Sequence, residues 1–78
     1  MELTLYSTDG CHLCDEAESL LQAERGARPA LGWVVVDIAG DDALFERYGW
    51  LIPVIKDGQG RELRWPFDAE ALRGFLDA

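Results

Sequence analysis

Residues 3–24 read LTLYSTDGCHLCDEAESLLQAE and carry three structural signals in immediate succession. The alternating apolar residues of 3–6 predict a short strand, and the composition of 7–10 predicts a loop. The helical spacing that follows predicts a helix that begins at the cysteine pair and stops near Gly26, since Pro29 disfavours continuation. Its two faces differ in polarity: Leu13, Ala17, Leu20 and Leu21 form an apolar face, and Glu16, Glu18, Gln22 and Glu24 fall mostly on the other.

The rest of the chain adds five more elements. These are a strand over 32–38, a short helix from 43 to 48 that Gly49 ends, a hairpin of strands 52–56 and 61–65, and a last helix that Asp68 caps. The β-branched run of 32–38 is typical of a strand covered on both faces, as in parallel pairing. Strand–helix–strand units favour parallel pairing, and the hairpin adds an antiparallel edge. The order β-α-β-α-β-β-α predicts an α/β fold with a mixed four-stranded sheet and helices on both faces.

Size and charge limit the class of protein. The chain has 78 residues, of which 49% are hydrophobic and 28% charged, so we expect one globular domain over 1–78. The net charge of −8 repels phosphate, so we expect neither nucleic acid nor a membrane surface as a partner. The longest mostly apolar run, 31–36, is too short to span a bilayer, and the N-terminus does not resemble a signal peptide. We therefore expect a cytoplasmic monomer.

The motif Cys11-His12-Leu13-Cys14 carries the strongest chemical information. Cys11 is expected at the loop-to-helix junction, where free backbone N–H groups and the helix dipole favour its thiolate. Cys14 lies one turn later, within reach of a mixed disulfide formed on Cys11. In a chain of strand–helix–strand pattern, this spacing predicts a catalytic pair in which Cys11 attacks and Cys14 resolves.

Two other interpretations of the cysteines remain open at this stage. A structural zinc site needs a second cysteine pair or a histidine pair, and the chain has only His12 and no other cysteine. Two inert, buried cysteines are the other alternative, although Asp9 and Asp15 place the motif in a polar setting. His12 either stabilises the Cys11 thiolate as an imidazolium or is a solvent-exposed turn residue.

The CxxC motif at a helix start, Ile52-Pro53 opening a later strand and the element order together resemble the thioredoxin superfamily, and more narrowly its short glutaredoxin-like proteins. The resemblance covers essentially the whole chain. It implies a cis peptide bond at Pro53, packed opposite the cysteines, and it assigns to the backbone of Ile52 the pairing with a bound peptide or glutathione. Trp50 stands two positions before Ile52, where it could touch a partner.

The chain departs from the glutaredoxin pattern at two places. Residues 7–10 contain an acid where glutaredoxins usually carry a basic residue that pairs with glutathione. Residues 65–68, Trp-Pro-Phe-Asp, replace the family's Gly-Gly and acidic pair, and we expect Asp68 to be a helix cap rather than a ligand contact.

Taken together, these features predict a thiol–disulfide oxidoreductase without a bound cofactor or metal. Glutathione or a thioredoxin system would be the external reductant, and the partner would be a disulfide-containing protein or glutathione. The alternatives are an iron–sulfur cluster-binding module and a non-catalytic thioredoxin-like adaptor.

Overall fold

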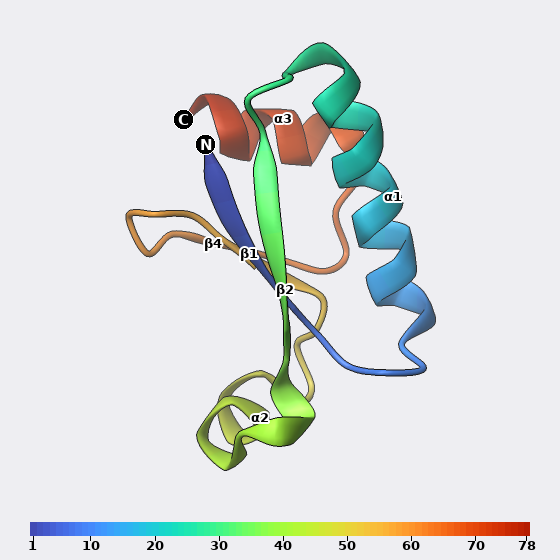
Figure 1. Ribbon diagram of the computed structural model, residues 1–78, viewed down its shortest axis with the longest axis vertical. Coiled ribbons are helices and arrows are strands. Elements are labelled where there is room, and N and C mark those ends of the chain that lie inside the picture. The colour runs from blue at the N-terminus through green and yellow to red at the C-terminus, as the bar shows by residue number, and fades with distance from the viewer.

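Figure 1 shows the computed structural model, which describes all residues from 1 to 78. The elements are β1 (Glu2–Ser7), α1 (His12–Ala27), β2 (Gly32–Asp37), the 3₁₀ helix η1 (Ile38–Gly40), α2 (Asp42–Tyr48), β3 (Val54–Lys56), β4 (Glu62–Arg64) and α3 (Ala69–Asp77). The predicted order is thus confirmed, with η1 as an addition. No helix has the length and apolar character that crossing a membrane requires.

The four strands form one mixed sheet in the order β2-β1-β3-β4. β1 and β2 are parallel, whereas β3 is antiparallel to both β1 and β4. Only the first strand–helix–strand unit therefore produces the parallel pairing that the sequence suggested. The second unit does not, because the chain after α2 returns beside β1 in the opposite direction.

The alternation of side chains along β1 divides the core between the two sheet faces. Leu3 and Leu5 face α1 and α3 in a larger core, whose buried members are Leu3, Leu5, Ala17, Leu21, Leu31, Ile55, Phe67, Leu72 and Leu76. Tyr6 points to the opposite face, where it stacks on Tyr48 of α2 with ring centroids 4.3 Å apart. This smaller core consists of Ile38, Tyr48 and Val54. The helices thus lie on both faces, as predicted, and α2 lies at the opposite end of the molecule from α3 (Figure 1).

The expectation that β2 is covered on both faces is wrong. Val34 is 49% exposed and Val35 is 53% exposed. β2 is an edge strand, and neither α2 on the face of Val34 nor α1 on the face of Val35 fully covers these side chains. A β-branched run therefore identified the strand correctly but not its position in the sheet.

The face that α1 buries also differs from the prediction. Its buried positions are Cys14, Ala17, Leu21 and Glu24, while Leu13 is 42% exposed. Cys14 takes the place expected of Leu13, and the helix continues through Gly26 to Ala27. Cys14 is the first residue of the buried face. The motif is therefore held in the core by Cys14 and exposed to solvent at Leu13.

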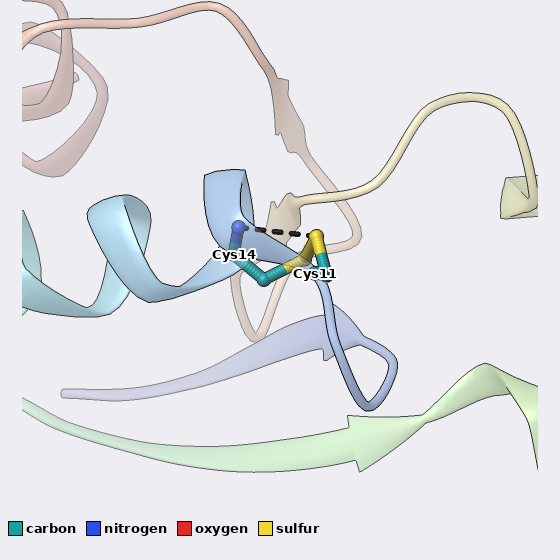
Figure 2. The surroundings of a disulfide bond; sticks show 2 residues. All are labelled: Cys11 and Cys14. Carbon is teal, nitrogen blue, oxygen red and sulfur yellow. Dashed lines mark hydrogen bonds between the residues drawn. A yellow bond between two sulfur atoms is a disulfide. The ribbon is translucent and has the colours of Figure 1, made fainter.

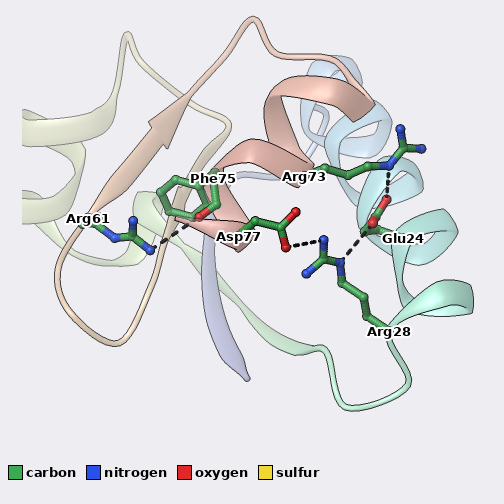
Figure 3. A network of polar contacts seen from close by, with 6 residues as sticks. All are labelled: Glu24, Arg28, Arg61, Arg73, Phe75 and Asp77. Carbon is green, nitrogen blue, oxygen red and sulfur yellow. Dashed lines mark hydrogen bonds and ion pairs between the residues drawn. The ribbon is translucent and has the colours of Figure 1, made fainter.

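The buried carboxylate of Glu24 joins α1 to α3 (Figure 3). Its two oxygens each accept a hydrogen bond of 3.1 Å, one from Nε of Arg28 and one from Nε of Arg73. Arg28 also donates to Asp77 at 2.7 Å, and these carboxylates raise its pKa. The network fastens the last helix across the C-terminal end of α1.

Candidate active site

The loop between β1 and α1 delivers the first cysteine to a helix terminus. Gly10 adopts a φ of 77°, a conformation that side chains with a Cβ rarely take, and turns the chain into the helix. The backbone N–H of Cys11 donates to the carbonyl of Thr8 at 3.4 Å. Cys11 is then the N-cap of α1, in an extended backbone conformation. The predicted position of Cys11 at the loop-to-helix junction is therefore confirmed.

Cys11 and Cys14 are joined by a disulfide bond, with their Cα atoms 5.2 Å apart (Figure 2). Cys14 is buried at 3% exposure, whereas Cys11 is partly exposed. The two sulfurs are thus within bonding reach, and only one of them is accessible from solvent. This asymmetry matches the expected division of labour between an attacking and a resolving thiol.

The start of α1 favours negative charge on the Cys11 sulfur. The backbone N–H of Cys14 donates to Sγ of Cys11 at 3.1 Å, so the sulfur occupies the acceptor position of a helix cap. When the bond is reduced, the same N–H and the dipole of the 16-residue helix stabilise a thiolate there. Asp15 in the first turn acts in the opposite direction by charge repulsion.

The Ile52–Pro53 peptide bond is cis, as the resemblance implied, and Pro53 is fully buried. Val54 pairs with Tyr6 in the sheet, so Pro53 stands level with the end of β1, from which the loop to Cys11 departs. The N–H of Ile52 already donates to the carbonyl of Tyr48 at 3.1 Å, while its own carbonyl accepts no hydrogen bond. Of the two backbone hydrogen-bonding groups of Ile52, only the carbonyl is thus free to pair with a partner.

His12 and Trp50 both lie on the surface. The indole of Trp50 is 97% exposed, and the imidazole of His12 is exposed within the motif. Neither side chain makes a hydrogen bond or an ion pair, so both are free to meet a partner. Asp68 accepts from the N–H of Ala71 at 2.8 Å, which confirms its prediction as the cap of α3.

An acidic cavity beside the disulfide was not anticipated from the sequence. It has a volume of about 210 Å³, and Cys14 and residues 7–10 form part of its wall. Four acidic residues line it, Asp9, Asp15, Glu18 and Asp37. The parallel pairing of β1 with β2 could have revealed it. The register of this pair places Asp37 beside Ser7, at the end of β1 from which the cysteine loop leaves.

The sheet, the disulfide at the start of α1 and the cis-proline before β3 define a thioredoxin-fold protein with a redox-type cysteine pair. The model of the glutaredoxin-like domain (DUF836) matches residues 2–77. The chain therefore belongs to this glutaredoxin-like family. None of the curated proteins matches it.

Solved structures agree with this assignment. The crystal structure of target protein XcR50 from X. campestris is 49% identical, with 96% of this chain and 95% of that chain covered and a TM-score of 0.83. Protein Ne2328 from Nitrosomonas europaea is 26% identical over 95% of this chain and 88% of its own, with a TM-score of 0.76. Thioredoxin 1 from Thermosipho africanus TCF52B is 12% identical over 99% and 91%, and its TM-score of 0.70 shows a shared fold.

Proposed function

We propose that this protein is a thiol–disulfide oxidoreductase that uses Cys11 and Cys14 as its catalytic pair. The observation that carries the proposal is the disulfide at the N-terminus of α1, with Cys11 partly exposed and Cys14 buried. A structural disulfide would gain nothing from such asymmetry, whereas exchange requires one sulfur that a substrate can reach.

The reaction starts from the reduced pair. The Cys11 thiolate attacks a substrate disulfide, a mixed disulfide forms, and one substrate sulfur leaves as a thiolate that takes a proton from water. The Cys14 thiolate then attacks Sγ of Cys11, which forms the observed bond and releases the second substrate sulfur. Two electrons pass to the substrate, and an external thiol reductant, glutathione or a thioredoxin system, returns them.

The surface around the pair supports an extended partner. The unpaired carbonyl of Ile52 can accept a backbone N–H, while Pro53 holds that strand end level with the cysteine loop. His12 within the motif and Trp50, two residues before Ile52, are both exposed and could add a polar and an apolar contact. The proposed partner is a disulfide-containing protein or glutathione. We propose that this protein acts on it as a monomer in the cytoplasm.

Disulfide reduction by purified protein tests the proposal. Wild type is expected to reduce bis(2-hydroxyethyl) disulfide when coupled either to glutathione and its reductase or to the thioredoxin system. Cys11→Ser should abolish the reaction, because no attacking thiol remains. Cys14→Ser should still form a mixed disulfide on Cys11, detected as a mass increase, and should fail to release it by intramolecular attack.

A redox titration against glutathione completes the test and gives the reduction potential of the pair. Absence of turnover with both reductants, together with absence of any mixed disulfide in Cys14→Ser, would overturn the proposal.

A further inference from the structure

The four carboxylates that line the cavity beside the disulfide are not neutralised by the chain. We propose that they make the exchange reaction selective for charge, so that it favours disulfides flanked by cationic groups and disfavours anionic ones such as glutathione disulfide. This inference rests on the proposed function and names the class of substrate that the same site prefers.

The first 24 residues contain no lysine or arginine, so no long cationic side chain accompanies the motif. Glu18 accepts a hydrogen bond from the indole of Trp33 at 3.3 Å, and Asp37 accepts one from the backbone N–H of Ala39 at 2.9 Å. Both donors are neutral and leave the negative charge in place. Every ion pair of the chain lies elsewhere, at Glu24, Asp57, Glu62 and Asp77.

The cavity and the disulfide share a wall, because Cys14 is one of the lining residues. The cavity lies on the β2 side of β1, through Val35 and Asp37, whereas Pro53 precedes β3 on the other side of β1. The loop that carries Cys11 leaves from the end of β1, between these two sides. A disulfide that reaches Cys11 therefore has one flank beside the carboxylates.

The four acidic residues line a cavity and do not converge on one point. No group of three or more acidic, histidine or cysteine side chains in the chain converges as metal ligands would. They therefore act on a substrate through their summed field and not as a chelating site. An elongated ammonium or guanidinium group fits a cavity of about 210 Å³ better than it fits a flat surface.

The size of the effect follows from Coulomb's law. A sphere of the cavity's volume is about 7 Å across, and at that separation in water one pair of unit charges changes a rate or equilibrium about threefold. Several carboxylates acting on a doubly charged substrate should therefore change its rate about tenfold or more at low salt. The effect should shrink as salt is added, because the screening length falls from about 30 Å at 0.01 M to about 8 Å at 0.15 M.

The experiment compares three disulfides of different charge with the pre-reduced protein. They are cystamine, a dication; bis(2-hydroxyethyl) disulfide, which is neutral; and glutathione disulfide, which carries a net negative charge. Each second-order rate constant is divided by that of dithiothreitol with the same disulfide, which removes differences in intrinsic reactivity. Rates are measured at low and at high NaCl concentration.

The variants are Asp9→Asn with Asp15→Asn in one chain, and Asp37→Asn, whose amide oxygen can still accept from Ala39. The control is Glu2→Gln at the far end of β1, which removes one negative charge, as Asp37→Asn does and half as many as the double variant. A change in thiolate reactivity caused by Asp15→Asn affects all three disulfides and cancels in their ratio.

The corrected rate constant for cystamine should exceed that for glutathione disulfide by about tenfold or more at low salt, and this ratio should fall as NaCl is added. The double variant should lower it severalfold, and Glu2→Gln should leave it unchanged. The neutral disulfide could react while the ratio is near one, or while the ratio does not change with salt or with the variants. Either result would refute the proposed charge selectivity and leave the proposed oxidoreductase function in place. If none of the three disulfides reacts, the proposed function itself fails and this inference fails with it.

Discussion

Removal of the Glu24 carboxylate should destabilise the protein measurably, because that group holds α1 and α3 together. The side chain is 7% exposed and accepts hydrogen bonds from Arg28 and Arg73 (Figure 3). In the sequence, Arg73 lies 49 residues after Glu24, and Arg28 lies four residues after it. Glu24→Ala removes both bonds and leaves Arg28 paired only with Asp77.

The exposure of the partners sets the magnitude. A hydrogen bond to a charged group contributes about 1.5–3 kcal/mol when it is shielded from water. The side chains of Arg28 and Arg73 are 31% and 58% exposed, so water replaces much of what each loses. We therefore expect Glu24→Ala to lower the free energy of unfolding by about 1–2 kcal/mol. For a domain of this size, that corresponds to a fall in Tm of about 4–16 °C.

Urea denaturation followed by far-ultraviolet circular dichroism measures this loss, with the disulfide kept oxidised throughout. Glu16→Ala is the control, because Glu16 is exposed on the same helix and makes no ion pair, and its effect should stay below about 0.5 kcal/mol. Glu24→Gln, which keeps the volume and one acceptor, should fall between the two. Equal midpoints for Glu24→Ala and Glu16→Ala would refute the role assigned to the network.

Two predictions concern pH. Burial opposes the charged form of Asp57, but hydrogen bonds from the backbone N–H and guanidinium of Arg61 and from the N–H of Gln59 outweigh it and lower its pKa. Its contribution to stability is therefore present above the unfolded pKa of about 3.9 and is lost as pH falls through the folded value, and an Asp57→Asn variant should show a smaller acid-induced loss in thermal melts. Burial, together with the hydrogen bond to Glu62, raises the pKa of Tyr48, so its contribution is present below about pH 10 and is lost as pH rises through the folded value. Tyr48→Phe should cost about 0.5–1.5 kcal/mol at neutral pH and flatten the alkaline loss of stability, and an unchanged alkaline transition would contradict this assignment.

Local patterns were sufficient for most of the elements. Asp68 caps α3 as its position indicated, and Asp41 caps α2 in the same way, since capping depends only on backbone groups two or three residues away. The CxxC motif likewise appears at a helix start with its sulfurs in bonding reach. Glu24 shows where local pattern fails: it falls on the polar side of the helical repeat, yet it is buried and its carboxylate pairs with Arg73 on another helix.

The chain's order of strands and helices, its helix caps and its paired cysteines at the start of α1 follow from residues that are near neighbours in sequence. The antiparallel return of β3, the edge position of β2 and the acidic cavity do not, because each depends on segments that meet only after the chain has crossed the sheet. Asp37 becomes a neighbour of the cysteine loop because β2 pairs with β1 in parallel, which places it opposite Ser7, 30 residues earlier in the sequence. Pairing over such distances is set by topology and packing, which a repeat of apolar residues does not encode.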